Sequence, residues 1–205
     1  MIFVFDLDDT VCDTDAYSEK YILDFINKNN LPYNFIKKEA RFAEMKFDWS
    51  ETEALKWYKT YGDQMMLEFP AKPEAIETIN ALFDAGHTII IATARATDWH
   101  TNPIEITYEW LKQNNVKYTK IYTGRVDKEA ICLDEKADFF IDDDIKITGR
   151  VALTTHISTT FNEKGCKPLL MSTNYNKTLE VPNGVTRIKD FKHFKEYLKE
   201  LNVKF

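Results

Sequence analysis

The chain begins MIFVFDLDDTVCDT (residues 1–14), in which a short apolar segment runs directly into a group of acids. The segment Ile2–Phe5 is wholly apolar, and four carboxylates follow it at Asp6, Asp8, Asp9 and Asp13. Like charges at short range repel each other, and an ionised carboxylate is costly to bury without a partner. This pattern predicts a buried strand whose end carries a site for a positively charged group.

Other short apolar runs resemble the first and alternate with helix-like stretches, which is the pattern of parallel βα units. The predicted strands are Ile2–Phe5, Thr88–Ala92, Lys120–Thr123, Asp138–Ile141 and Pro168–Met171. Their apolar residues are continuous, as expected for a sheet covered by helices on both faces. The predicted helices of this part are Pro73–Ala85, Pro103–Asn114, Asp127–Lys136 and Phe191–Leu201. We therefore expect an α/β fold with a Rossmann-like parallel sheet.

The first two predicted strands are separated by more than eighty residues, far more than one crossover needs. The helix Pro73–Ala85 accounts for the crossover and leaves residues 14–72 as surplus. Three stretches of this surplus have apolar residues at helical spacing: Tyr17–Ile26, Phe35–Met45 and Glu51–Met66. The sequence thus predicts a core domain of residues 1–13 and 73–205 and a helical cap of residues 14–72, inserted between strands 1 and 2.

A second group of acids follows the strand Asp138–Ile141, where Asp142, Asp143 and Asp144 stand in a row. Ligands of open parallel sheets bind at the carboxyl ends of the strands, so acids that close neighbouring strands converge there. Facing carboxylates suit a hard divalent cation, and Mg²⁺ takes one or two of them together with water and substrate phosphate. We expect a Mg²⁺ site, and the sequence leaves open which of the three acids binds the ion directly.

Two further segments offer what a phosphate group needs. The strand Thr88–Ala92 leads into Thr93, Ala94 and Arg95, which supply a hydroxyl and turn amides for phosphoryl oxygens. Lys128 lies 14 residues before Asp142, in the first turn of a predicted helix, so one helix and a short connection bring it back over the acids. A lysine there is a compact positive charge that neutralises nucleophile and phosphate together.

In chain order, Asp6-Leu7-Asp8-Asp9-Thr10, Thr93, Lys128 and Asp142-Asp143 resemble the four motifs of the haloacid-dehalogenase-like (HAD) superfamily. The resemblance covers nearly all of the chain, and the insertion resembles that superfamily's helical cap of the first type. The stretch Lys128–Asp143 and the tail Ser172–Asn176 are similar to the 5′(3′)-deoxyribonucleotidase-like branch. One departure is Asp9, which stands where many members have glycine.

The resemblance implies a Mg²⁺-dependent phosphomonoesterase. Asp6 would be the nucleophile that forms an aspartyl-phosphate, and Asp8 the general acid and base. Thr93, Ala94 and Lys128 would hold the phosphate. The metal set would comprise Asp6, Asp8 through its carbonyl, Asp142 and Asp143.

The implied substrate is a small phosphorylated molecule, with a (deoxy)nucleoside monophosphate favoured. Phe47 and Trp49 stand in a short non-helical stretch of the insertion and are the candidates for stacking on a base. Arg95 is a further candidate specificity residue, although a salt bridge to a nearby acid is its favoured role. Two alternatives stay open. One is a phosphatase for another small metabolite or for polynucleotide 3′ ends, and the other is a non-catalytic binding protein of the same fold.

Bulk properties set the remaining expectations. A formal net charge of −6 argues against a surface that grips a nucleic-acid backbone, and the apolar runs are too short to cross a bilayer. Cys12, Cys132 and Cys166 are odd in number and lack metal-type spacing, which favours reduced thiols. No secretory signal is recognised before the first strand. We therefore expect a cytoplasmic protein without a membrane partner; the sequence does not indicate an oligomeric state.

Overall fold

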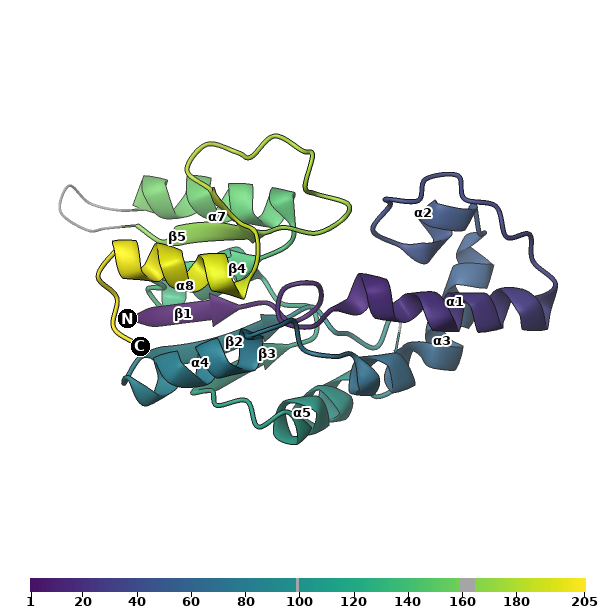
Figure 1. Ribbon diagram of the computed structural model, residues 1–205, viewed down its shortest axis with the longest axis horizontal. Helices are drawn as coiled ribbons and strands as arrows, with labels where there is room; N and C mark the ends of the chain where they lie inside the picture. Colours follow the sequence, from purple (N-terminus) through teal and green to yellow (C-terminus); the bar gives the residue numbers. More distant parts are fainter. Residues whose placement is uncertain (99, 159–164) are drawn as a thin grey trace.

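The computed structural model describes residues 1–98, 100–158 and 165–205, and a six-stranded sheet forms the centre of this part of the chain (Figure 1). The strands are β1 (Ile2–Phe5), β2 (Thr88–Thr93), β3 (Lys120–Thr123), β4 (Phe139–Asp142), β5 (Lys167–Met171) and β6 (Thr186–Ile188). Their order is β3-β2-β1-β4-β5-β6, and all neighbours are parallel. The predicted α/β fold is confirmed, and β1 lies between β2 and β4.

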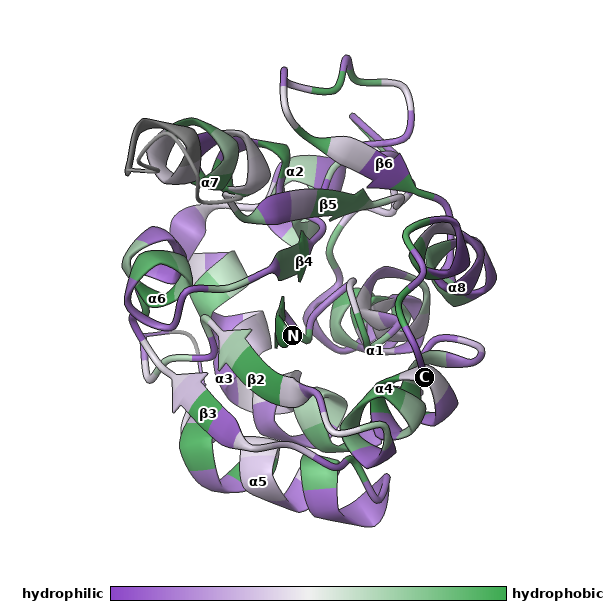
Figure 2. Cartoon of the chain, turned by 90° about the vertical axis from the view of Figure 1, so that its left-hand side faces the viewer, coloured by the Kyte–Doolittle hydropathy of each residue, from purple (hydrophilic) through white to green (hydrophobic). Residues whose placement is uncertain are grey.

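Helices cover both faces of the sheet, as the continuous apolar strands predict (Figure 2). The helices α4 (Ala75–Asp84), α5 (Pro103–Gln113) and α8 (Phe191–Glu200) pack on the face to which Phe3 and Phe5 point. The opposite face, with Val4 and Phe140, is covered by α6 (Lys128–Asp134) and α7 (Ile145–Ser158). Successive side chains of β1 therefore enter two separate hydrophobic clusters.

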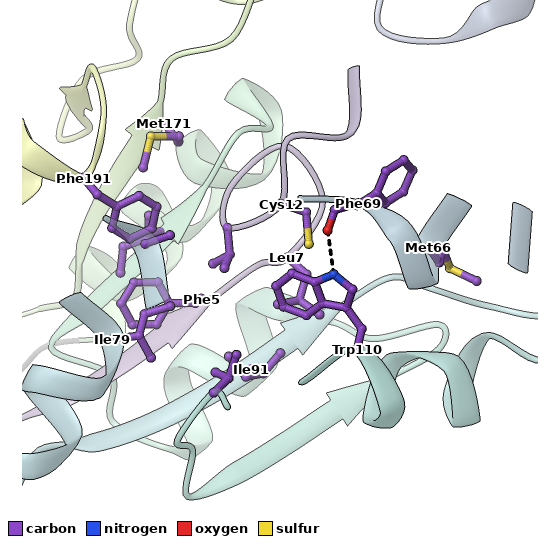
Figure 3. Close-up of a cluster of buried hydrophobic side chains, with 14 of the residues drawn as sticks. Phe5, Leu7, Cys12, Met66, Phe69, Ile79, Ile91, Trp110, Met171 and Phe191 are labelled. Carbon is purple, nitrogen blue, oxygen red and sulfur yellow. Dashed lines mark hydrogen bonds between the residues drawn. The ribbon is translucent and has the colours of Figure 1, made fainter. Parts of the chain in front are cut away.

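The surplus between β1 and α4 forms α1 (Thr14–Asn29), α2 (Ala43–Phe47) and α3 (Glu51–Glu68), and we call residues 14–72 the helical insertion. It lies beyond the carboxyl ends of the strands, on the right of Figure 1. Apolar residues of α1 and α3 belong to the same hydrophobic cluster as β1 and α4. At the return to the core, the indole nitrogen of Trp110 donates to the carbonyl oxygen of Phe69 at 2.8 Å (Figure 3).

Three local predictions differ from the structure. The expected helix Phe35–Met45 is irregular up to residue 42, and only Ala43–Phe47 is helical. Phe35 and Ile36 are 38% and 63% exposed, so these side chains bury little apolar surface that could stabilise a helix there. Helix α4 begins at Ala75 rather than Pro73, because Glu74 has a left-handed φ of 63°. The sequence reading omitted α7 and the three-residue strand β6.

Within the described ranges, no helix is both long and apolar enough to span a membrane. All three cysteines are free and buried. Cys12 belongs to the larger hydrophobic cluster, while Cys132 and Cys166 belong to the one under α6 and α7.

Candidate active site

The acids that close β1 and β4 lie side by side at the carboxyl edge of the sheet. The two strands pair from Phe3 to Phe5, and the ladder continues where the backbone N–H of Asp6 donates to the carbonyl oxygen of Ile141 at 2.9 Å. Asp142 is the last residue of β4 and is fully buried, while Asp6 is 4% exposed. The expected meeting of the two strand ends is therefore present.

Lys128 joins these two acids. Its Nζ lies 2.7 Å from Oδ1 of Asp6 and 2.6 Å from Oδ2 of Asp142. It is the first residue of α6, and that start is fixed because the carboxylate of Asp127 accepts the backbone N–H groups of Glu129 and Ala130. Lys128 is therefore held over the strand ends by a capped helix.

Burial and the neighbouring charges decide the protonation of this group. Burial alone would lower the pKa of Lys128, but the carboxylates of Asp142 and Asp6 outweigh it and raise the pKa above its usual value. Burial raises the pKa of Asp6 to about 7, with Lys128 opposing and Asp142 and Asp8 adding to the rise. Lys128 consequently remains a cation, and a further positive charge beside Asp6 would stabilise its ionised form.

A third buried carboxylate completes a cluster that could hold a metal ion. One carboxylate oxygen each of Asp6, Asp142 and Asp143 lies within 4.8 Å of the others. Oxygen donors of this number and charge suit Mg²⁺, which keeps waters in its remaining positions. The donor set therefore fits a hard divalent cation.

Asp144 and Asp9 have other partners. Oδ1 of Asp144 accepts the backbone N–H groups of Lys146 and Ile147 at the start of α7, at 2.8 and 3.1 Å. Oδ1 of Asp9 accepts those of Thr14 and Asp15 at the start of α1, at 3.1 and 2.9 Å. Both acids therefore stabilise helix starts. This role distinguishes Asp144 from Asp142 and Asp143, which remain the candidate metal ligands.

Asp8 is held by Arg95 through two hydrogen bonds, from Nε at 2.9 Å and from Nη2 at 2.7 Å. Burial would raise the pKa of Asp8, but Arg95 outweighs this and lowers it, so Asp8 is ionised in this arrangement. The guanidinium is almost fully buried, with Nη1 unpartnered among the described residues. Arg95 thus forms the salt bridge to a nearby acid that we favoured over a role in substrate selection, and its partner is the expected acid–base group.

The segment after β2 supplies a buried hydroxyl. Thr93 is fully buried at the end of this strand, beside β1, and its Oγ1 has no hydrogen-bond partner within the described part of the chain. Ala94 follows and contributes to the wall of a cavity. A buried hydroxyl without a partner is costly, which suggests that Thr93 is placed for a ligand.

That cavity, of about 390 Å³, lies between the helical insertion and the acidic edge of the sheet. Its floor contains Asp6, Asp8 and Lys128. The helical insertion contributes two cations, Arg41 and Lys46. It also contributes a largely apolar wall, formed by Ile22, Phe42, Trp57, Tyr58, Met65, Met66 and Phe69. The volume suits a small molecule, with a charged end on the floor and an apolar end against the wall.

Comparison with known proteins places this arrangement in a known fold. No family model and no curated protein matches the sequence. Among solved structures, a haloacid dehalogenase-like hydrolase from Streptococcus pneumoniae covers 96% of this chain and 97% of its own, at 14% identity and a TM-score of 0.64. The chain has the haloacid-dehalogenase-like fold.

Two further structures with this HAD-like fold match over almost their whole length. A predicted phosphatase from Clostridium acetobutylicum is 15% identical with a TM-score of 0.65, covering 97% of this chain and 98% of its own. A D,D-heptose 1,7-bisphosphate phosphatase from B. bronchiseptica, complexed with magnesium and phosphate, is 16% identical with a TM-score of 0.53, covering 98% of each chain. At such identities the likeness shows the fold alone.

The two aromatic residues that we expected at the substrate lie elsewhere in this HAD-like chain. Phe47 and Trp49 are 4% and 7% exposed, stack on each other with ring centroids 5.6 Å apart, and are absent from the cavity lining. The rings that do line it include Trp57 and Tyr58, on α3. Phe47 is also the last residue of α2 and not part of a non-helical stretch, so the reason for preferring it does not hold.

Sequence reasoning also missed Arg41 and Tyr175. Arg41 lies before α2, and its Nη2 is 3.0 Å from Oδ2 of Asp143. The hydroxyl of Tyr175, in the loop after β5, donates to the same oxygen. Both residues are more than 30 positions from Asp143 in the chain, and only the folded arrangement brings them there.

Proposed function

We propose that this protein is a Mg²⁺-dependent phosphomonoesterase that acts through an aspartyl-phosphate on Asp6. The observation that carries the proposal is the environment of Asp6. Its carboxylate lies at the floor of a cavity of small-molecule size, bonded to Lys128 and beside two further buried acids. A buried nucleophile held among charges of both signs is what transfer of an anionic group requires.

The residues that would hold Mg²⁺ are Asp6, the backbone carbonyl of Asp8, Asp142 and Asp143. When bound, Mg²⁺ supplies positive charge that offsets the repulsion between the Asp6 carboxylate and an anionic phosphate. Lys128 adds a further positive charge beside Asp6. Thr93 and the backbone at Ala94 are assigned to the transferring phosphoryl oxygens, which gives an acceptor to the hydroxyl of Thr93, a group without a partner among the described residues.

In the first step, a carboxylate oxygen of Asp6 forms a bond to phosphorus as the bond to the leaving oxygen breaks. Asp8 gives its proton to that oxygen. In the second step, water attacks the phosphorus, Asp8 takes the proton, and the bond between phosphorus and Asp6 breaks. The ionised Asp8 paired with Arg95 corresponds to the form that accepts a proton from water.

For the substrate we propose a nucleoside monophosphate. The wall opposite the acids is apolar and contains the rings of Phe42, Trp57 and Tyr58, which suit a flat base better than a polyhydroxylated sugar. The indole N–H of Trp57 is buried without a hydrogen-bond partner among the described residues. A ring nitrogen or carbonyl oxygen of a base offers the acceptor that this donor lacks.

The reaction is tested with p-nitrophenyl phosphate, with and without EDTA. We expect metal-dependent release of p-nitrophenol by the wild type, and a loss of at least about a thousandfold in Asp6→Asn. Asp134→Asn, an exposed change on α6, is the matched control and keeps full activity. Release that persists in EDTA, or an active Asp6→Asn variant, would exclude this mechanism; no release at all favours a binding protein.

The substrate is tested with a panel of nucleoside monophosphates, sugar phosphates and a 3′-phosphorylated oligonucleotide. We expect the highest kcat/KM for nucleotides, and a rise in KM of about tenfold for Trp57→Leu with these substrates but not with p-nitrophenyl phosphate. Sugar phosphates that react as well as nucleotides would remove the nucleotidase assignment and leave the phosphatase assignment standing.

A further inference from the structure

The loop that follows β5 reaches the candidate metal site through one hydroxyl. The Oη of Tyr175 donates to Oδ2 of Asp143 and lies 3.1 Å from Oδ2 of Asp9. The carboxylate of Asp143 is fully buried, and Asp9 is 7% exposed. Tyr175 is therefore a neutral donor placed among acids that repel one another.

Hydrogen bonds of Asn176, the residue after Tyr175, fix the backbone of this loop. The side-chain amide of Asn176 donates to the carbonyl oxygens of Asp143 and Met171, both at 2.8 Å. Its Oδ1 accepts the backbone N–H of Thr173 at 2.9 Å and Nη1 of Arg187 at 3.1 Å. Asn176 is 1% exposed, so the backbone beside Tyr175 is fixed to the very residue whose side chain Tyr175 contacts.

The two carboxylate oxygens of Asp143 have different partners. Oδ2 is occupied by Tyr175 and by Nη2 of Arg41 at 3.0 Å. Among the described residues, Oδ1 has a single long contact, 3.4 Å, with the hydroxyl of Thr10. The oxygen that remains available to a cation shared with Asp6 and Asp142 is therefore Oδ1.

We propose that Tyr175 is a positioning residue that orients Asp143 for a divalent cation. The inference rests on the proposed function only in that the site binds such an ion. Partners behind a ligating carboxylate fix its orientation, and their loss costs metal affinity. Tyr175 does this without adding positive charge, whereas Arg41 contacts the same oxygen with a cation that competes electrostatically with the metal.

The two contacts therefore predict opposite effects on binding. In Tyr175→Phe the ring remains but the orienting hydroxyl is lost, so affinity for the ion falls. In Arg41→Met a competing positive charge is lost, so affinity stays equal or rises. General damage to the site would weaken binding in both variants, and this contrast separates positioning from a merely structural role.

The experiment titrates Mn²⁺ and Mg²⁺ into the purified, metal-free full chain by calorimetry and follows free Mn²⁺ by electron paramagnetic resonance. We expect the Kd of Tyr175→Phe to rise about 10- to 100-fold, with an unchanged Tm in EDTA. Tyr118→Phe, which removes a hydroxyl before β3 at the opposite end of the strands, is the matched control and binds like the wild type.

Equal affinity of Tyr175→Phe and the wild type, or a comparable loss in Arg41→Met, overturns the proposal. If Tyr175→Phe does not fold, Tyr175→Leu, which also removes the hydroxyl and introduces neither a charge nor a metal ligand, carries the same comparison. A wild type that binds neither ion refutes the metal site itself, and with it the proposed function. The two failures are therefore told apart by the wild-type titration alone.

Discussion

Asp9 has a backbone φ of 56°, in the left-handed region that favours glycine. Aspartate is among the few residues other than glycine that adopt this conformation readily, which is consistent with its presence at this turn. Here the residue gains a second use, because its carboxylate accepts the first N–H groups of α1. The turn that presents Asp6 and Asp8 therefore also fixes the start of the helical insertion.

Thr93→Val should separate stability from activity. The variant removes a buried hydroxyl that has no partner in the described part of the protein, so we expect the free energy of unfolding to rise by about 1 kcal/mol. If this hydroxyl binds a phosphoryl oxygen, kcat/KM falls by about a hundredfold. Urea unfolding and steady-state kinetics measure the two effects.

Thr88→Val, at the start of the same strand, is the control and should leave kcat/KM unchanged. A destabilised Thr93→Val with normal kinetics would show that the hydroxyl has a structural partner instead.

The sequence was informative for residues whose neighbours follow from strand order. Asp6 directly follows β1, Asp142 ends β4, and Lys128 is one helix away from β4, so the sequence predicted their meeting on the condition that these two strands are neighbours, as they are. Arg41 and Asp144 are 103 residues apart, and their ion pair depends on how the insertion folds back over the sheet. No local pattern encodes that path, and Tyr175 was missed for the same reason.

At the scale of elements, continuous apolar runs predicted the strands well because a doubly covered sheet makes burial uniform along each strand. The same reasoning failed at Phe35–Met45, where helical spacing occurs but Phe35, Ile36 and Met45 remain 38%, 63% and 57% exposed. It failed again for the aromatics of α3, since spacing does not say which face of a helix meets the cavity. Periodicity thus predicts elements more securely than it predicts their contacts.

Helix α3 packs closely against the loop after β2 at Gly62. A Cβ added at Gly62 would lie 2.3 Å from Nδ1 of His100, so the ring must move in Gly62→Ala. We expect a net loss of about 1–3 kcal/mol in unfolding free energy despite the better helix propensity of alanine. The His100→Ala change removes the ring that clashes. Gly62→Ala should therefore lower the unfolding free energy much less in the His100→Ala background than in the wild type. A stabilised single variant would contradict the contact.

Glu68 ties the end of α3 to α1. Its Oε2 accepts the hydroxyl of Tyr21 at 2.5 Å and its Oε1 the amide of Gln64 at 2.8 Å, and these bonds, with Lys20, lower its pKa from 4.5 to about 2. A depressed carboxyl pKa stabilises the fold fully above the unfolded value and loses this effect as pH falls through the folded value. The stabilisation by Glu68 should therefore be present above pH 4.5 and vanish between about 4.5 and 2.

The variant Glu68→Gln tests this by urea unfolding at several pH values. We expect it to be less stable than the wild type by about 1 kcal/mol at neutral pH, since the side chain is 35% exposed and solvent screens the charge. The difference should shrink as the pH falls below 4.5. Glu19→Gln, an exposed change on α1, is the charge-matched control. A difference that is independent of pH would show that the ionised carboxylate is not what matters.

Over the whole molecule, the helical insertion and the sheet share one hydrophobic cluster, which includes Phe25 and Trp57 of the insertion together with Phe5 and Ile79 of the core. A cluster that crosses the boundary couples the unfolding of both parts, so the insertion should not unfold by itself. The boundary is also bridged by Trp110, which is fully buried and donates to the carbonyl oxygen of Phe69. The insertion is therefore positioned over the acids by the same packing that stabilises the core.

Trp110→Phe tests this coupling. The change removes a buried hydrogen bond and leaves a small void, and we expect the free energy of unfolding to fall by about 3 kcal/mol. Because both parts unfold together, far-UV circular dichroism and tryptophan fluorescence should give one coincident urea transition with an unchanged m-value. Tyr108→Phe, an exposed change on the same helix, should leave the midpoint in place. Two separate transitions in the wild type would instead mean that the insertion is an independent folding unit, and the fluorescence of Trp49 and Trp57 would then report the earlier one.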